Sequence, residues 1–307
     1  MINFKKYSSM SKAIIPNNVQ IDKNTLYNAF RNMRYLQSIS IPDSVTNISN
    51  MCYNCPNITT AICPPNVTNM SYAYYACYNL TGSPICGENV TNMAYAYNGC
   101  TNLTGSTACG NKVTYMAYAY YGCKNLKTAV CGSNITSMSF AYFNCINLIG
   151  SPVCGENVTN MYLAYGKCYN LTGSPVCGNN VTNMTNAYFN CRNLTGAPVC
   201  GNNVVSLYGT YTNCYNLCGN AYFYSNNVSR VYNCFNGRNT SNRLNIYVHN
   251  GSTTMNTLLI NSSSSMTGRS ITWTNNLATN GCYYNTIQNI YIYPVTNVEN
   301  TAKETET

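Results

Sequence analysis

The sequence predicts an α/β solenoid, a single elongated right-handed stack of coils, each about 23 residues long with a short parallel strand and a short helix. Three observations predict this fold class. Two ladders of cysteines recur in step, every coil repeats one apolar face, and only 7% of the residues are charged. A repeat of this length is typical of one solenoid coil.

The cysteine ladders define the repeat, because each steps by 22 or 23 residues. The first ladder comprises Cys55, Cys77, Cys100, Cys123, Cys145, Cys168, Cys191 and Cys214. The second comprises Cys63, Cys86, Cys109, Cys131, Cys154, Cys177 and Cys200. Met33 and Ile41 stand at ladder positions in an earlier coil, so both positions accept a compact apolar side chain. We expect most thiols to be buried and unpaired, with disulfide bonds between coils as the alternative.

A short helix is expected in each coil. In residues 89–110, the apolar residues are spaced at i, i+3, i+4 and i+7, as on one face of a helix; they are Met93, Ala96, Tyr97 and Cys100. The tyrosine of this face recurs as Tyr74, Tyr97, Tyr120, Tyr142, Tyr165, Tyr188 and Tyr211. Since a buried phenol must hydrogen-bond, we expect each hydroxyl to reach a backbone carbonyl, a turn asparagine or solvent.

A turn and an extended piece follow each predicted helix. The turn carries an asparagine in seven consecutive coils: Asn79, Asn102, Asn125, Asn147, Asn170, Asn193 and Asn216. Stacked asparagine side chains would hydrogen-bond the turn backbone of successive coils. Prolines interrupt the extended piece at Pro84, Pro152, Pro175 and Pro198. Proline cannot donate to a strand ladder, so strands of only about two to four residues are expected.

Nonrepeating segments flank the repeat body, which covers residues 26–234. Residues 1–25 hold Lys5, Lys6, Lys12 and Lys23 and are expected to form a basic N-terminal cap or docking segment. Residues 235–298 are expected to form a C-terminal cap. Residues 299–307 are polar and are expected to be disordered.

Within the expected C-terminal cap, three segments have clear patterns. Residues 243–250 and 289–295 alternate like strands, and residues 252–260 are typical of a helix that Ser252 caps. Tyr291 and Tyr293 offer an oligomer contact as the alternative to a cap.

The inventory of reactive residues argues against an enzyme. The chain has one His and seven Asp and Glu residues, and no catalytic motif is present. Only Cys52 and Cys55 have CxxC spacing, with no second pair nearby, so neither metal nor cofactor is expected. The repeats hold no continuous basic stripe, which excludes nucleic acid as an expected partner.

The sequence pattern predicts neither a membrane-spanning segment nor a secretory signal peptide. No run of about 18 apolar residues occurs, so no membrane span is expected. The first residues, MINFKKYSSMSKAIIPNN, offer only Ala13 to Ile15 where a secretory signal would need a longer apolar stretch.

Two rows of outward aromatic residues form the candidate binding surface. The main row comprises Tyr72, Tyr95, Tyr118 and Phe140, and gives way to Leu163 and Asn186. The companion row is broken and comprises Tyr75, Tyr121, Phe143 and Phe189. Exposed aromatic rows are typical of interfaces or sugar-stacking platforms. The alternative is that the rows merely cover the helical side of a tyrosine-rich solenoid.

The repeat frame resembles a known family. IPDSVTNISNMCYNCPNI (residues 41–58) and NVTNMSYAYYACYNLT (residues 66–81) are similar to the BspA-like leucine-rich repeat family, whose units place a Val-Thr-x-Ile step, an Ala-Phe step, a Cys and a Leu in this order. The resemblance covers Leu26 to Cys234 and implies leucine-rich-repeat-like coils. This sequence departs from the family by placing Met for Ile, Tyr for Phe, and Cys or Pro in the strand.

A second resemblance concerns function. The tandem form LTGSPVCGNNVTNM (residues 171–184) is similar to repeat proteins carried by bacteriophages of gut bacteria. It implies a nonenzymatic virion component, of the tail or fibre, that serves host attachment or particle assembly and is made in the host cytoplasm. The alternatives are a BspA-like cell-surface adhesin and an intracellular protein-binding scaffold. Expected partners are other virion or surface proteins, a host surface glycan or protein, or a second copy of the chain.

Overall fold

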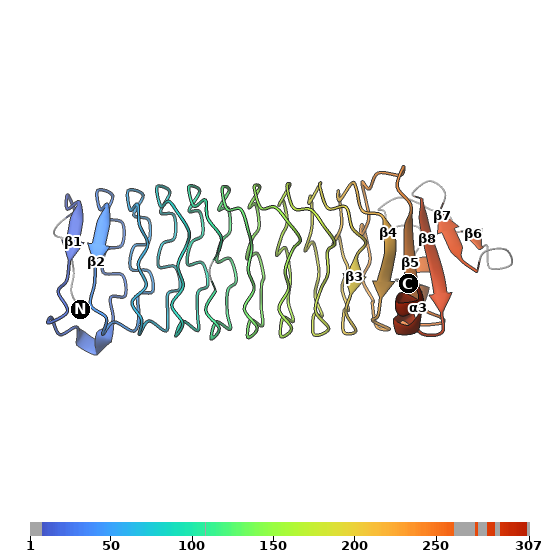
Figure 1. The fold of residues 1–307 in the computed structure, drawn as a ribbon, viewed down its shortest axis with the longest axis horizontal. Helices are drawn as coiled ribbons and strands as arrows, with labels where there is room; N and C mark the ends of the chain where they lie inside the picture. The colour runs from blue at the N-terminus through green and yellow to red at the C-terminus, as the bar shows by residue number, and fades with distance from the viewer. Residues whose placement is uncertain (1–7, 108, 261–273, 276–280, 286–288, 306–307) are drawn as a thin grey trace. The chain divides into compact units, whose positions relative to one another are not determined.

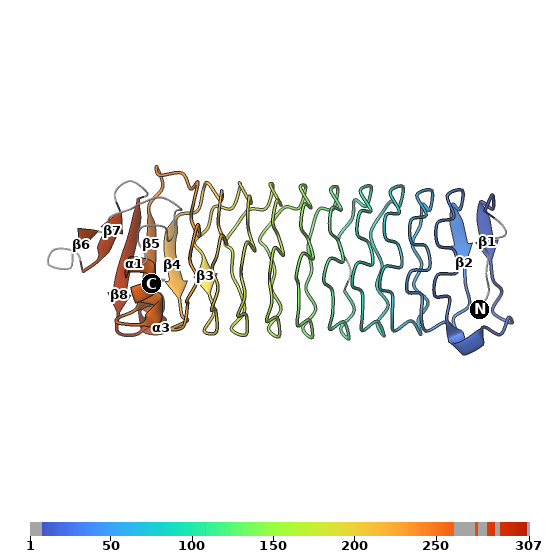
Figure 2. The ribbon, with the colours of Figure 1, turned by 180° about the vertical axis from the view of Figure 1, so that it is seen from behind.

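The structure is a computed structural model of the chain, and it describes residues 8–107, 109–260, 274–275, 281–285 and 289–305. It divides into two compact units, Met1–Leu148 and Ile149–Thr307. Within each unit, successive turns of the chain lie side by side as coils (Figure 1; Figure 2). Parallel bridges join equivalent residues of neighbouring coils, Asn47, Asn69, Asn92, Tyr115 and Ser137 in the first unit and Asn160, Asn183, Ser206 and Arg230 in the second. The predicted repeat solenoid is therefore confirmed in each unit.

The first unit begins with a short parallel pair. Strand β1 (Lys12–Ile14) pairs with β2 (Ser38–Ser40), and the 3-10 helix η2 (Asp22–Asn24) lies between them in the sequence. Residues 12–14 of the expected basic segment are thus the strand of a first coil, while Lys5 and Lys6 lie outside the described residues. In the described coils of this unit after β2, isolated bridges replace the strands of two to four residues that the sequence predicted.

The short helices predicted in the repeats are wrong, because these segments are successions of tight turns. The N–H of Ala96 donates to Met93 O at 3.0 Å, and the N–H of Cys100 donates to Tyr97 O at 3.0 Å. The N–H groups of Tyr95 and Tyr97 instead donate to the next coil, so no helical i to i−4 series can form. Tyr95 itself has left-handed backbone, with φ of 57°.

The buried face of these segments is as predicted, although the helix is not. Met93, Ala96, Tyr97 and Cys100 are all fully buried. Consecutive tight turns return the chain to the same face every three or four residues, as a helix does. The spacing of apolar residues therefore identifies which face is buried, but it cannot distinguish a helix from a succession of tight turns.

The core tyrosines supply hydrogen bonds that a strand ladder would otherwise make. The hydroxyl of Tyr97 donates to Ile85 O at 2.6 Å and accepts from Ile85 N at 3.1 Å. Tyr74 makes the same pair with Ile62, at 2.6 and 2.8 Å. The rings stack from coil to coil, with centroids 5.5 Å apart between Tyr74 and Tyr97. The expectation that these hydroxyls reach a backbone carbonyl is confirmed at Tyr74, Tyr97, Tyr142, Tyr165 and Tyr188. The hydroxyl of Tyr211 instead lies 3.5 Å from Cys200 Sγ.

The first cysteine ladder packs in the core as free thiols. Cys77, Cys100 and Cys123 are fully buried, and their Sγ atoms lie 3.1, 3.0 and 2.9 Å from carbonyl oxygens of the preceding coil. Desolvation raises the pKa of each of these thiols well above its usual value. Cysteine fits this position because it is compact and still carries a weak donor for a carbonyl that packing removes from water.

The second cysteine ladder is buried at Cys177 and Cys200 and less buried than expected at its other members. Cys63, Cys86 and Cys109 are half-buried, because each side chain lies at the edge of the core beside a glycine of the next coil. A Cβ built on Gly87 would lie 3.1 Å from Cys63 Sγ, so this glycine leaves room for the sulfur. Burial raises the pKa of Cys63 to about 11 and that of Cys109 to about 12.

A mixed sheet occupies the end of the second unit. Its order is β3-β4-β5-β8-β7-β6, from β3 (Val199–Cys200), β4 (Gly219–Phe223), β5 (Leu244–His249), β6 (Thr274–Asn275), β7 (Tyr283–Asn285) and β8 (Ile290–Val295). Strands β3, β4, β5 and β8 are parallel, and β7 turns antiparallel. Helix α1 (Thr253–Ile260) begins where Met255 N donates to Ser252 Oγ at 3.1 Å. The two predicted strands and the predicted capped helix are confirmed as β5, β8 and α1.

The polar C-terminal segment is not disordered as expected, because it forms helix α3 (Val298–Thr305). Val298 and Ala302 lie one helical turn apart and pack with Tyr222 in a buried cluster. Two apolar residues on one face thus suffice to dock the helix. Residues 306 and 307 lie outside the described part.

The tyrosine hydrogen bonds predict a specific pattern of stability losses. Tyr97→Phe leaves the N–H and C=O of Ile85 without this partner and should cost about 1–3 kcal/mol. Tyr97→Ala also leaves a cavity and should cost about 3–5 kcal/mol. Chemical denaturation measures both losses. Tyr35→Phe, at a side chain that is 62% exposed, is the control and should be neutral; a Tyr97→Phe variant as stable as this control would contradict the account.

Thiol titration tests the cysteine ladders. With a pKa of about 11, Cys63 carries little thiolate at pH 8, so alkylation in the native protein should be slow and should accelerate as pH rises. In denaturant many thiols should react at once. Nearly complete disulfide pairing would contradict the packing account.

The same thiols predict a loss of stability in alkali. The unfolded thiols ionise near pH 8.5, whereas burial holds the folded pKa of Cys63 and Cys109 higher. The folded state therefore binds more protons above about pH 8.5, and the free energy of unfolding should fall as pH rises toward 11. Denaturation midpoints at pH 7 and pH 10 check this direction.

Candidate functional site

The main aromatic row forms a continuous stack of rings in the first unit. Ring centroids are 4.4 Å apart between Tyr72 and Tyr95, 4.5 Å between Tyr95 and Tyr118, and 4.4 Å between Tyr118 and Phe140. The planes of the three tyrosines are parallel within 6°. All four residues are half-buried. The structure therefore brings together the row that the sequence predicted.

Backbone strain marks the same four residues. Their φ angles are 57° at Tyr72, Tyr95 and Tyr118 and 56° at Phe140, a region unusual for bulky side chains. Equivalent left-handed positions elsewhere hold Asn28, Asn50, Asn186, Asn233 and Gly209, which tolerate this region, and the bulky Leu163. Such strain costs on the order of 1 kcal/mol per residue, and ring stacking of about 0.5–1.5 kcal/mol per pair offsets it. The aromatic side chains are thus not required by the turn.

The stacking changes what this surface offers to a ligand. In the sequence, exposed aromatic rows suggested interfaces or sugar-stacking platforms. Interior rings of the main row use both faces on their neighbours, as Tyr95 does between Tyr72 and Tyr118. Ring edges and hydroxyls remain available instead. This geometry favours contact with a protein surface over sugar stacking on the interior rings.

The companion row consists of two separate stacks in the first unit. Tyr53 and Tyr75 stack at 4.6 Å, and Tyr121 and Phe143 stack at 5.2 Å. The guanidinium of Arg31 lies 4.1 Å from the centre of the Tyr53 ring and covers its outer face. Tyr53 was not predicted as part of this row, although its position in the repeat matches that of Tyr75. Phe189 belongs to the second unit.

Three tyrosines of the two rows are neutral at physiological pH. Burial is the largest cause that raises the pKa of Tyr72, Tyr95 and Tyr75, and the proximity of other phenols raises it further. These hydroxyls therefore stay protonated at neutral pH and act as neutral donors and acceptors.

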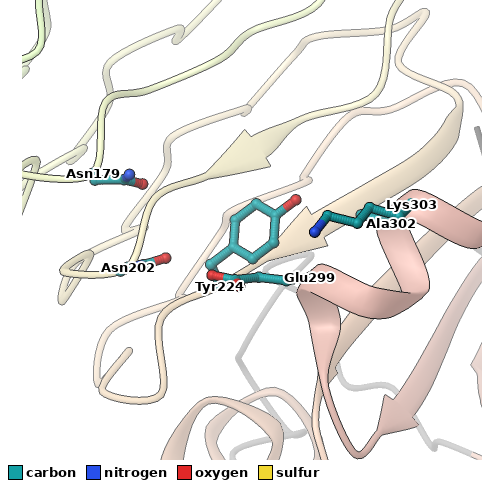
Figure 3. A pocket seen from close by; sticks show the side chains of 6 residues that line it. All are labelled: Asn179, Asn202, Tyr224, Glu299, Ala302 and Lys303. Atoms are coloured by element: carbon teal, nitrogen blue, oxygen red, sulfur yellow. The ribbon is translucent and has the colours of Figure 1, made fainter.

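A polar pocket that sequence analysis missed lies in the second unit. It measures about 290 Å³ and is lined by Asn179, Asn202, Tyr224, Glu299, Ala302 and Lys303. Figure 3 shows the Tyr224 ring between the two asparagines and the side chains of α3. An adjoining cavity of about 320 Å³ shares Tyr224 and includes His249. The pocket could not be predicted from the sequence, because three of its lining residues belong to α3, a segment that was expected to be disordered.

Two further observations concern the described residues alone. No three His, Cys, Asp or Glu side chains among them gather as metal ligands would. No helix in the same residues is long and apolar enough to span a membrane.

Comparison with solved structures finds other leucine-rich repeat proteins. A leucine-rich repeat protein from Bacteroides ovatus is 15% identical with a TM-score of 0.45, and the match covers 77% of this chain and 76% of that chain. A leucine rich cell surface protein from Faecalibacterium prausnitzii is 17% identical with a TM-score of 0.39, covering 78% of this chain and 82% of that chain. No curated protein matches the sequence.

The family comparison is more extensive. The model of the BspA type leucine rich repeat region matches in six copies, over residues 2–104 and 93–221. These residues are well over half of the 307 in the chain. They also contain most of the coils, the core tyrosines and both aromatic rows described above. The chain therefore belongs to the BspA type leucine rich repeat family.

Proposed function

We propose that the chain is a nonenzymatic recognition protein that acts in adhesion at a cell surface, with the two aromatic rows as its binding surface. The main row is the observation that carries this proposal. Four consecutive coils place an aromatic ring at a left-handed position where other coils place mostly asparagine or glycine. Retaining strained aromatic residues is typical of a functional site, since the turn itself does not need them.

Family membership favours adhesion over the virion component that the second resemblance implied. The chain matches the BspA type repeat over most of its length, and the comparisons give no support to a phage tail or fibre protein. The cell-surface adhesin, first an alternative, is thus the better supported reading.

A protein is the favoured ligand of this surface. The interior rings offer edges and neutral hydroxyls, as described for Tyr95, and edges suit the flat, partly polar surfaces of proteins. Tyrosine also contributes strongly to protein interfaces, because its ring buries much area and loses little conformational entropy.

Substitution of the main row tests the proposal. The variant Tyr72→Asn, Tyr95→Asn, Tyr118→Asn introduces at each position the residue found at Asn50, so the left-handed backbone is kept. We expect binding to an array of immobilised extracellular proteins and glycans to fall at least tenfold, while the unfolding midpoint changes little. Loss of three stacked rings is offset by relief of the strain.

Tyr35→Asn is the matched control. It is the same chemical change at an exposed residue outside both rows, and Asn57 and Asn79 stand at the equivalent turn position. It should bind the array as the unmodified chain does. Equal binding by the triple variant and the control would refute the aromatic rows as the binding surface.

A further inference from the structure

The companion row has a break at a single coil. Equivalent positions in three successive coils hold Tyr75, Asn98 and Tyr121. The rings on both sides keep the same relation to the parallel main row, with Tyr75 6.0 Å from Tyr72 and Tyr121 5.9 Å from Tyr118. Their planes are tilted by 42° and 32° from those of Tyr72 and Tyr118, so Tyr75 and Tyr121 flank the coil that lacks a ring in similar positions.

The width of the break follows from the coil spacing. Two coil steps in the main row measure 4.4 and 4.5 Å, which sets Tyr75 and Tyr121 about 9 Å apart. Within the companion row, stacked rings lie 4.6 Å apart between Tyr53 and Tyr75. The break thus has room for one more aromatic ring at the spacing that the row itself uses.

Asn98 lies at the inner end of the break. It is only 9% exposed, and its backbone groups bond to Tyr95 O and Ala76 N. Its side-chain amide makes no hydrogen bond among the described residues and keeps some contact with solvent. The amide can therefore donate to, or accept from, a polar group that enters the break.

We propose that the break binds a tyrosine side chain of a protein partner, with the ring between Tyr75 and Tyr121 and the phenol hydroxyl on the Asn98 amide. A ring that enters from outside points its far end inward, so a para hydroxyl is the group that meets Asn98. Phenylalanine would fill the space without a hydrogen bond to the amide. This proposal rests on the proposed function, since it names one contact of the same aromatic surface.

Saturation-transfer NMR on the full chain tests the site with small uncharged probes at millimolar concentration. We expect N-acetyl-tyrosinamide to give strong ring signals, N-acetyl-phenylalaninamide several-fold weaker signals, and methyl β-glucopyranoside none. Asn98→Tyr supplies the missing ring from the chain itself, as at Tyr75 and Tyr121, and should abolish the tyrosinamide signal. Asn98→Leu should remove the preference for tyrosinamide over phenylalaninamide.

The outcomes separate this proposal from the broader one. Equal tyrosinamide signals from the unmodified chain and Asn98→Tyr, or binding of the glucopyranoside alone, overturn the tyrosine site. If Asn98→Tyr still binds the protein array and the triple main-row variant does not, the surface stands and the site fails. If the probe binds in the break but the triple variant keeps array binding, the site stands and the proposed function fails. Thermal unfolding of Asn98→Tyr, expected to match the unmodified chain, verifies that the variant is folded.

Discussion

The hydrogen bonds between the core tyrosines and the extended segments are the interaction on which the repeats depend. Between β2 and β3 the described extended segments form isolated bridges in place of a regular strand ladder, and the hydroxyl of Tyr97 bonds both backbone groups of Ile85. One side chain thereby fills the core and satisfies the main chain of the extended segment that precedes its turns. The turns on the opposite side are then free to send alternate N–H groups to the next coil, which fixes how neighbouring coils stack.

In each coil, different side chains of the same turns therefore form the core and the surface. Met93, Ala96, Tyr97 and Cys100 point inward and are fully buried, whereas Tyr95, on the same turns, points outward. The outward position is strained for a large side chain but constant in backbone conformation. Recognition can therefore be carried by side chains that contribute little to the core, and family membership accounts for the scaffold without specifying the ligand.

Much of this architecture was predictable from the residues, and the failures have physical causes. The period identified the coils, the buried tyrosines and the main row, because each depends only on which side of the chain a residue faces. The helices were wrong because turns with left-handed residues such as Tyr95 keep nearly the same periodicity. Helix α3 was missed because only Val298 and Ala302 mark its buried face. Mutual covering of ring faces, and the break at Asn98, depend on distances between coils that periodicity does not contain.

The left-handed outward position has a consequence for how such proteins diversify. Across the described coils it is occupied by asparagine, tyrosine, phenylalanine, leucine and glycine without change of backbone. A single codon change in one coil therefore adds or removes a ring at a chosen height while the fold is retained. Because rings of adjacent coils stack, each such change also alters which ring faces its neighbours expose, while the backbone of the scaffold stays the same.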